Sequence, residues 1–199
     1  MKVLVACEFS GVVRDAFLEK GHDAVSCDIL PTEQPGPHYQ GDVRDILNGG
    51  WDMMIAHPPC TYLANSGVSW LYRQEGRWEK MREGALFFRD ILNADIPQIC
   101  VENPIQHKYA REIIGEKYTQ IVQPFQHGHP ESKQTCLWLK NLPPLEPSEL
   151  LHAPKDGKWE NQTKSGQNKL APSVDRWKER SRTYPGIAEA MAKQWGLLK

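Results

Sequence analysis

Cys60 is the residue in this sequence best placed to act as a nucleophile. It follows the apolar run Met53–Ala56 and the pair Pro58-Pro59. The run is typical of a strand buried on both faces of a parallel sheet, and the prolines end it because neither can donate a backbone hydrogen bond. The pattern predicts a thiol on a stiff loop at the carboxyl end of a strand, where open α/β sheets place their sites. A small buried cysteine without a chemical role is the alternative.

A second polar group follows another predicted strand. Residues 96–101 form an apolar segment that leads into Glu102-Asn103-Pro104. Because the carboxyl ends of parallel strands meet at one edge of a sheet, we expect Glu102 to lie near Cys60. A thiol and a carboxyl group would then face the same crevice.

The amino-terminal segment predicts a binding site for a nucleotide. We expect a strand at residues 2–7 and an amphipathic helix at 10–20, joined by the Glu-Phe-Ser-Gly turn of residues 8–11. Ser10 is predicted to cap this helix, whose amino terminus favours a carboxylate or phosphate ligand.

Two aspartates follow at positions that suit a cofactor. Asp28 ends the second predicted strand, residues 23–27, where an acidic side chain commonly binds ribose hydroxyls. A solvated aspartate that starts a loop is the alternative. Asp42 follows a proline-rich loop at 30–39 and is either a third ligand contact or the cap of the turn at 43–47.

The rest of the chain alternates helices and strands. A long helix is expected at 75–93, and its core-facing residues are predicted to be Trp78, Met81, Ala85, Phe88 and Leu92. The further predicted elements are a helix at 105–115, strands at 119–124 and 134–140, and a last helix from 184 or 185 to 195. This alternation predicts an α/β fold, with a Rossmann-like, mostly parallel sheet and helices on both faces.

Composition sets outer limits on the fold and its surroundings. The 199 residues, 40% of them hydrophobic, suffice for one domain with a full core. No apolar run approaches the length of a membrane span and no signal peptide is recognisable, so we expect a cytoplasmic protein. Five scattered cysteines do not suggest a disulfide framework. His127, His129 and Cys136 lack a further cysteine at ligand spacing, so no metal is expected.

The carboxyl-terminal segment is basic, although the whole chain has a formal charge of −1. Residues 152–199 contain ten lysines and arginines against five acidic residues, together with Trp159 and Trp177. Such a segment can hold a nucleic acid, or it only keeps the protein soluble. Residues 141–173 have few apolar side chains and are expected to form a long loop.

The order of these motifs resembles the cytosine-5 DNA methyltransferases. The matching residues, in chain order, are Phe9-Ser10-Gly11, Asp28, Gly41-Asp42, Pro58-Pro59-Cys60 and Glu102-Asn103. They span most of the chain, and the similarity is strongest at residues 55–60 and 100–103. The resemblance implies a Rossmann-like, S-adenosylmethionine-dependent methyltransferase that acts on carbon 5 of cytosine in DNA, in a bacterial or phage-infected host cell.

The resemblance also implies roles for individual residues. Cys60 would add to carbon 6 of cytosine, Glu102 would protonate ring nitrogen 3 if burial raises its pKa, and Lys133 would meet a phosphate or the base carbonyl. The residues implied to bind S-adenosylmethionine are Glu8, Phe9, Ser10, Gly11, Asp28, Ile29, Asp42, Val43 and Pro58. Those expected to bind the substrate are Pro59, Asn103, Lys158, Lys164 and Lys169.

The sequence departs from the family pattern at several positions. Val13 replaces the second glycine of the cofactor turn, Pro104 stands where the family usually has valine, and the family's glutamine-arginine-arginine motif is reduced to Glu131, Lys133 and Thr135. Little chain is left for a target-recognition domain. We therefore expect a minimal, phage-like member with a catalytic core at 1–140, an extended basic loop region at 141–179, and a helix at 180–199 that returns to the core.

The substrate is open at this point. A minimal core could methylate short motifs in duplex DNA, single-stranded DNA, or a free deoxycytidine nucleotide. A catalytically inactive relative that binds nucleic acid or a host protein is another class, which intact Cys60 and Glu102 oppose. An amino-methyltransferase is a further alternative, because His57-Pro58-Pro59-Cys60 loosely resembles the polar-Pro-Pro-aromatic loop of those enzymes. However, Cys60 stands where their aromatic ring clamps the flipped base.

Overall fold

The computed structural model describes residues 1–155, 157–164, 168–171 and 173–198. Its strands are β1 (Lys2–Ala6), β2 (Asp23–Asp28), β3 (His38–Gln40), β4 (Met53–Ala56), β5 (Gln98–Asn103), β6 (Gln120–Val122) and β7 (Thr135–Lys140). They form a seven-stranded sheet in the order β3-β2-β1-β4-β5-β7-β6. β7 is antiparallel to both β5 and β6, and the other neighbouring strands are parallel.

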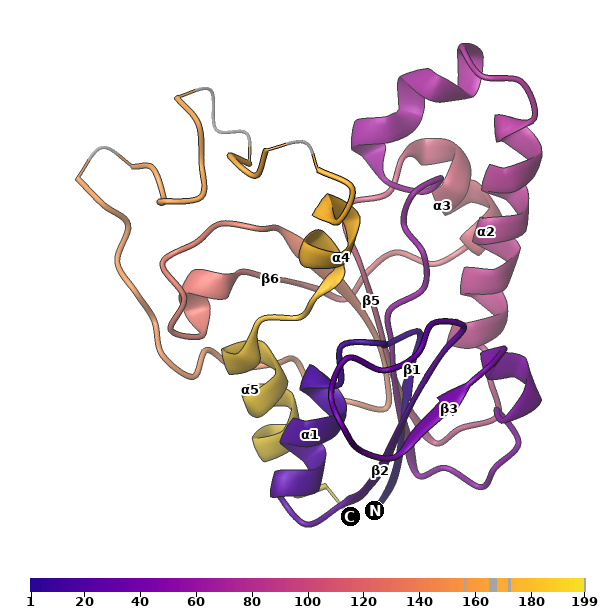
Figure 1. The fold of residues 1–199 in the computed structure, drawn as a ribbon, viewed down its shortest axis with the longest axis vertical. Coiled ribbons are helices and arrows are strands. Elements are labelled where there is room, and N and C mark those ends of the chain that lie inside the picture. The colour runs from indigo at the N-terminus through magenta and orange to yellow at the C-terminus, as the bar shows by residue number, and fades with distance from the viewer. Residues whose placement is uncertain (156, 165–167, 172, 199) are drawn as a thin grey trace.

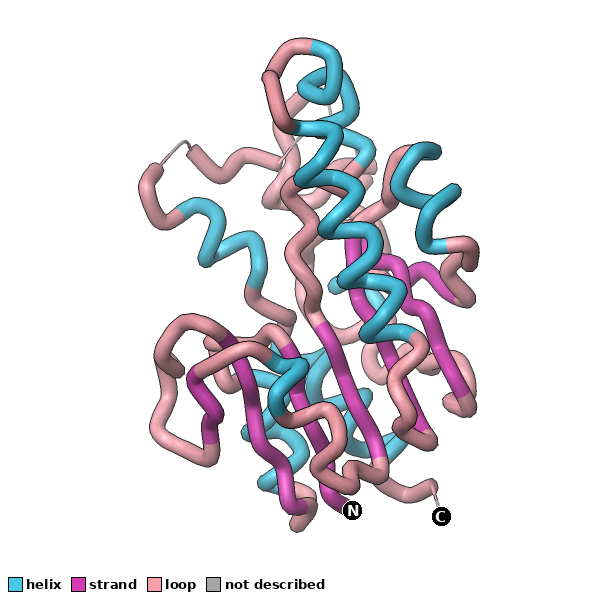
Figure 2. Tube along the Cα trace, turned by 90° about the vertical axis from the view of Figure 1, so that its right-hand side faces the viewer, coloured by secondary structure: helices cyan, strands magenta, loops and turns pink. Residues whose placement is uncertain are grey.

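Helices cover both faces of this sheet (Figures 1 and 2). α1 (Val12–Glu19) and α5 (Pro185–Trp195) pack on one face, and α2 (Arg77–Leu92) and α3 (Lys108–Ile114) on the other. The shorter helices are α4 (Arg176–Ser181) and the 3₁₀ helices η1 (Val43–Asp45), η2 (Asn65–Tyr72) and η3 (Pro124–Gln126). No helix among the described residues is long and apolar enough to cross a membrane.

Alternating side chains of β1 divide the core into two layers. Val3 and Val5 pack on the face that carries α1 and α5, whereas Leu4 and Ala6 pack on the face that carries α2. All four are fully buried. A strand buried on both faces is typical of the centre of a parallel sheet.

The order of the strands reverses next to β1. The chain passes from β1 to β2 and β3 on one side and returns through β4 and β5 on the other. The predicted Rossmann-like, mostly parallel sheet is thereby confirmed. Open α/β sheets form their ligand crevice outside the carboxyl ends of the strands at such a reversal.

The first helix is capped differently from the prediction. Gly11, at φ 76°, is the residue before α1, and Ser10 contributes only a long bond of 3.4 Å from the N–H of Val12. The carboxylate of Glu8 accepts the backbone N–H groups of Val13 at 2.7 Å and Arg14 at 3.3 Å. A charged acceptor at the positive end of the helix dipole replaces the expected hydroxyl.

Strand β5 begins and ends two residues later than the predicted strand at 96–101. It runs to Asn103 rather than ending at residue 101, because Glu102 and Asn103 pair with Leu137 and Cys136 of the antiparallel β7. Both polar residues therefore have the fixed backbone of a strand.

One residue that was predicted to face the core from the long helix is not buried. Trp78 is 40% exposed and contacts the rings of Tyr72 and Tyr109, whereas the other four predicted core residues of α2 are buried. Trp78 lies in the first turn of α2, beside η2, where the helix has passed the edge of the sheet (Figure 1).

Arg14 holds the loop between β2 and β3. Its side chain is fully buried and donates to Ser26 and to oxygen atoms of residues 32–35. In the same loop, Glu33 binds Arg182 of the carboxyl-terminal segment at 2.7 Å. Arg14 thus fixes a loop that in turn holds the carboxyl-terminal segment.

Replacing Arg14 with leucine should lower the free energy of unfolding by about 3–5 kcal/mol, because buried loop oxygens lose their donor. Arg44→Leu is the matched control, since its ion pair with Asp42 is exposed and such pairs contribute about 0–1 kcal/mol. Urea unfolding followed by circular dichroism measures both changes. Similar losses in the two variants would contradict the role given to Arg14.

Candidate active site

Strand β4 carries Cys60 on a loop that begins at His57. The backbone N–H of His57 still donates to β1 at 2.9 Å, after which the two prolines offer no donor. The buried side-chain amide of Asn103, at the end of β5, donates to the carbonyl oxygen of Pro58 at 2.8 Å. This bond ties the Cys60 loop to the strand that carries Glu102.

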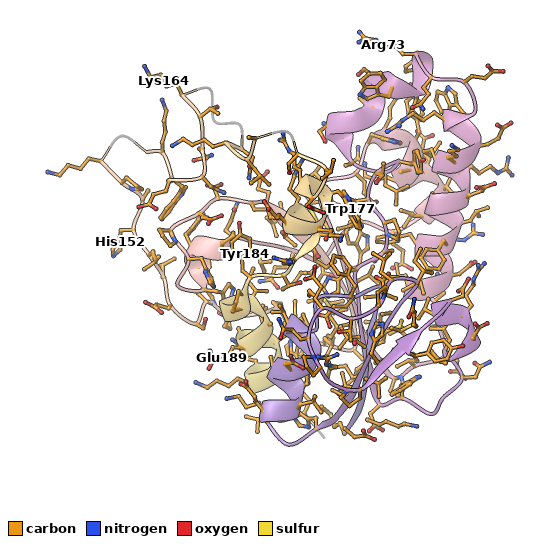
Figure 3. The ribbon with its side chains drawn as sticks, viewed as in Figure 1. Arg73, His152, Lys164, Trp177, Tyr184 and Glu189 are labelled. Atoms are coloured by element: carbon orange, nitrogen blue, oxygen red, sulfur yellow. The ribbon has the colours of Figure 1, made fainter. Side chains whose placement is uncertain are left out.

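A cleft of about 1580 Å³ opens at this edge of the sheet. The predicted cofactor residues that line it are Phe9, Asp28, Ile29, Asp42, Val43 and Pro58. The predicted catalytic and substrate residues that line it are Pro59, Cys60, Glu102, Asn103, Lys133 and Lys169. Trp177 and residues 179–185 form another wall, with Trp177 and Tyr184 marked in Figure 3.

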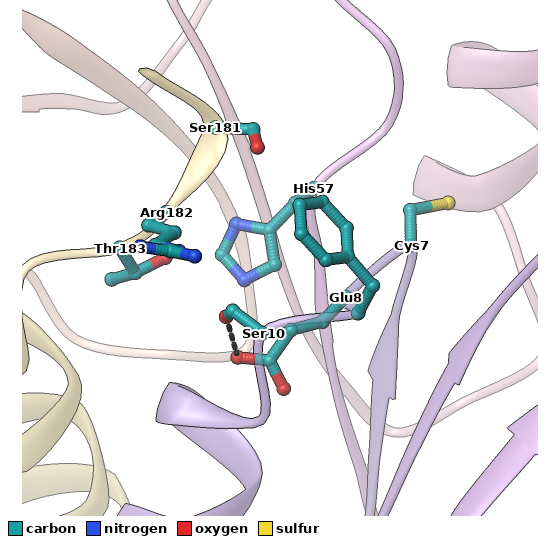
Figure 4. A pocket seen from close by; sticks show the side chains of 8 residues that line it. Cys7, Glu8, Ser10, His57, Ser181, Arg182 and Thr183 are labelled. Carbon is teal, nitrogen blue, oxygen red and sulfur yellow. Dashed lines mark hydrogen bonds between the residues drawn. The ribbon is translucent and has the colours of Figure 1, made fainter. Parts of the chain in front are cut away.

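Three predicted cofactor residues lie apart from this cleft. Glu8 and Ser10 line a small cavity of about 10 Å³ together with His57 and residues 181–183 (Figure 4). Gly11 is among the described lining residues of neither space. The Glu8 carboxylate is engaged as the cap of α1, so it serves the fold in this structure.

On the cofactor side, an aromatic pair and a carboxylate face the cleft. The ring of Phe9 lies 5.9 Å from that of Trp177, which is 52% exposed. Asp28 accepts a backbone N–H of its own loop at 2.9 Å, and burial raises the pKa of Asp28. Asp42 caps η1, and its hydrogen bonds with Arg44 lower the pKa of Asp42 to about 2. A ligand contact by Asp42 would therefore compete with Arg44.

The basic loop reaches the cleft only in part. Lys169 lines it, whereas Lys158 and Lys164 are not among the described lining residues. Lys164 stands at the outer end of the loop in Figure 3. Trp159 is buried and stacks on Phe125, with ring centres 4.8 Å apart. In this structure Trp159 therefore packs within the protein and does not offer an exposed ring.

The surroundings of Cys60 favour the neutral thiol. Burial raises the pKa of Cys60, and the negative charge of Glu102 raises it further. The positive charges of Lys133 and Arg180 act in the opposite direction but do not reverse the shift. A nucleophilic thiolate therefore requires a change in the charge of its neighbours.

Glu102 shows the opposite shift from the one expected. Burial alone would raise the pKa of Glu102, but the hydrogen bond and charge of His57, together with the charge of Lys133, lower it below its ordinary value. Nδ1 of His57 lies 2.9 Å from Oε2 of Glu102. The expectation of a raised pKa is wrong for this structure, because it left His57 out.

Lys133 contacts the chain itself. Its Nζ donates to the backbone carbonyl oxygens of Arg180 at 2.7 Å and Arg182 at 3.4 Å, and it lies 5.6 Å from the centre of the Tyr184 ring. Lys133 therefore holds the carboxyl-terminal segment against the cleft. Contact with a substrate would require exchange of these bonds.

From the sequence, His57 was named only in the amino-methyltransferase alternative and was given no role beside Cys60 and Glu102. The available signal was a titratable side chain at the end of β4, directly before the Pro-Pro-Cys loop. The charge of Arg180 near Cys60 had no local signal, since it depends on how the segment before α5 folds back over the cleft.

Comparison with known proteins adds little to this geometry. No protein-family model and no curated protein matches the chain. EhMeth, a methyltransferase of Entamoeba histolytica, is similar at a TM-score of 0.47 and 17% identity over 75% of this chain and 57% of EhMeth. WbdD, solved with the kinase inhibitor LY294002, is similar at a TM-score of 0.36 and 13% sequence identity. This match covers 68% of this chain and 35% of WbdD. This chain thus spans little more than half the length of EhMeth, and neither match identifies an activity.

The charges around Cys60 predict how fast iodoacetamide alkylates it. Alkylation should be slow at neutral pH. Glu102→Gln should move the midpoint of the rate–pH curve downward, because it removes a negative charge, and Lys133→Met should move it upward. Peptide mass spectrometry follows Cys60 separately from the other cysteines. Midpoints that stay the same in both variants would exclude this electrostatic coupling.

Proposed function

We propose that this protein is an S-adenosylmethionine-dependent methyltransferase that acts on carbon 5 of cytosine in DNA, with Cys60 as the nucleophile. The observation that carries the proposal is the bond between Asn103 and Pro58, which holds the Cys60 loop beside the end of β5. As a result, Cys60 and Glu102 line one cleft with Phe9 and Asp28.

The residues on the cofactor side suit S-adenosylmethionine. The Asp28 carboxylate at the end of β2 would accept hydrogen bonds from ribose hydroxyls, and the Phe9 and Trp177 rings offer apolar surface to the adenine. The cleft is large enough for a nucleoside and a base together. Bound S-adenosylmethionine would supply an electrophilic methyl group.

The protein groups would activate the base. Cys60 would add through Sγ to carbon 6, which makes carbon 5 nucleophilic. Glu102 would donate a proton to ring nitrogen 3 as this bond forms. A proton on Glu102 also removes the negative charge that raises the pKa of Cys60. Protonation of one carboxyl group therefore favours both the thiolate and the addition. Loss of the carbon 5 proton to solvent then expels Cys60.

A free deoxycytidine nucleotide is the second candidate substrate. The observation that favours it is that Lys158 and Lys164 are not among the described residues that line the cleft. Lys169 and Arg180 line the cleft and would suit a phosphate in either substrate. A polymer would in addition extend beyond the cleft toward the basic loop. An inactive binding relative would not need the juxtaposition of Cys60 and Glu102.

A cytosine with fluorine at carbon 5 should trap the enzyme, because it cannot lose a proton there. With S-adenosylmethionine present, we expect a covalent adduct on the peptide that contains Cys60, and none with Cys60→Ser. Comparing duplex DNA, single-stranded DNA and the free nucleotide as carriers of the analogue identifies the substrate. An adduct on any other peptide would remove Cys60 from the mechanism.

Asp28→Ala should weaken S-adenosylmethionine binding by about 1–3 kcal/mol, since a charged hydrogen-bond partner is lost. Asp45→Ala is the control, because Asp45 is an exposed aspartate at the end of η1 that is absent from the described cleft lining. Isothermal titration calorimetry measures both affinities. Equal affinities in the two variants would place the ribose elsewhere.

A further inference from the structure

His57 has one ring nitrogen bound to Glu102 and the other without a partner. Nδ1 lies 2.9 Å from Oε2 of Glu102. Nε2 is buried and has no hydrogen-bond partner among the described residues, and the His57 side chain is only 9% exposed. An unpaired buried polar atom costs free energy, so its presence beside the candidate nucleophile calls for a reason.

The small cavity lies on the Nε2 side of this ring. Glu8, Ser10, Arg182 and Thr183 line it with His57, and Figure 4 shows the imidazole facing this group. Its volume of about 10 Å³ suits one water molecule. The imidazole therefore stands between a wettable cavity and the carboxyl group of Glu102.

We propose that His57 is the proton-donating partner of Glu102: it orients the carboxyl group and supplies, through Nδ1, the proton that Glu102 gives to ring nitrogen 3 of cytosine. This inference rests on the proposed function and extends it to a residue outside the Cys60 and Glu102 motifs.

With His57 in place, Glu102 needs such a donor. Glu102 is held as a carboxylate in this structure, because His57 lowers its pKa, and a carboxylate has no proton to give. Among the described residues, the titratable group hydrogen-bonded to Glu102 is His57. A histidine can accept a proton at one nitrogen and release one at the other near neutral pH.

The proton balance of the step is complete. The proposed step starts from a pair with one proton on each ring nitrogen of His57 and none on Glu102. The Cys60 thiol first releases its proton to solvent. When the Sγ–carbon 6 bond then forms, the Nδ1 proton passes to the carboxyl group and from there to ring nitrogen 3, which leaves a neutral imidazole. When Cys60 departs, nitrogen 3 returns this proton along the same path. The carbon 5 proton leaves separately to solvent.

Charged groups on every side of His57 influence this pair. Glu102 faces it from β5, and the positive charge of His57 in turn lowers the pKa of Glu8, which burial raises. The other titratable or charged groups near the imidazole or Glu102 include Cys7, Cys60, Cys100, Lys133, Cys136 and Arg182. The net effect of these groups on proton release from His57 is therefore measured by the dependence of the methylation rate on pH.

Two substitutions separate proton donation from simple orientation. His57→Asn keeps a hydrogen-bond donor near the position of Nδ1, but its side chain cannot gain or lose a proton. His57→Phe keeps the shape of a ring but removes both the hydrogen bond to Glu102 and the proton donor. His152→Asn is the control, because His152 lies exposed on the outer loop. Cytosine methylation is measured from pH 5.5 to 9 after circular dichroism and S-adenosylmethionine binding have shown that each variant is folded.

We expect His57→Asn to move the alkaline limb of the rate–pH profile downward by about one unit, so that turnover at pH 8 falls about tenfold relative to pH 6. His57→Phe should also lose turnover as the pH rises, because only the proton that Glu102 itself carries is then available, and Glu102 loses it at alkaline pH. The His152→Asn profile should match that of the unchanged protein. If the His57→Asn profile also matches that of the unchanged protein, the proposal is overturned, since orientation of the Glu102 carboxyl group would then suffice for activity.

The alkylation of Cys60, which does not require turnover, tests this proposal separately from the proposed function. In His57→Phe, burial raises the pKa of Glu102 unopposed by a histidine, so Glu102 keeps its proton to higher pH and the alkylation midpoint of Cys60 should fall. An unchanged midpoint would overturn the proposed link between His57 and Glu102. If the unchanged protein methylates no cytosine substrate, the proposed function fails, and the midpoint still decides whether His57 controls the protonation of Glu102.

Discussion

The hydrogen bond from the side chain of Asn103 to the carbonyl oxygen of Pro58 is the constraint on which the site depends. Two consecutive prolines cannot extend the ladder of β4, because they have no N–H to donate. A loop without backbone donors would be free to swing away from the sheet. The buried amide of Asn103 replaces the missing ladder bond and keeps Cys60 beside the end of β5.

This proximity makes Cys60 and Glu102 electrostatically dependent on each other. A carboxylate beside a buried thiol raises the pKa of the thiol, and a neighbouring imidazole lowers the pKa of the carboxyl group. Each shift alone works against covalent catalysis. Together they form a resting state in which one proton, delivered to Glu102, changes both groups at once. The site is therefore best understood as a set of three residues that includes His57.

Most of the sheet could be predicted because its strands other than β3 carry their own signals, such as the run at Met53–Ala56 and its proline stop. β3 (His38–Gln40) was missed, because it overlaps the segment expected to be a proline-rich loop. Features that depend on distant contacts could not. Glu8 rather than Ser10 caps α1, because Gly11 adopts a positive φ and turns the chain so that the carboxylate reaches the helix. Likewise, Trp159 is buried by stacking on Phe125, which no local pattern indicates.

The stretch just before α5, which contains Arg180 and Arg182, contacts both sides of the cleft. Lys133 of the loop before β7 binds its backbone, and Glu33 of the loop after β2 binds Arg182. These contacts join a loop on the cofactor side to one near Cys60. Because they are polar and partly exposed, they cost less to break than core packing does. Displacement of this segment on one side would therefore also move the charges of Lys133 and Arg180 relative to Cys60, so the two sides of the cleft are physically coupled through it.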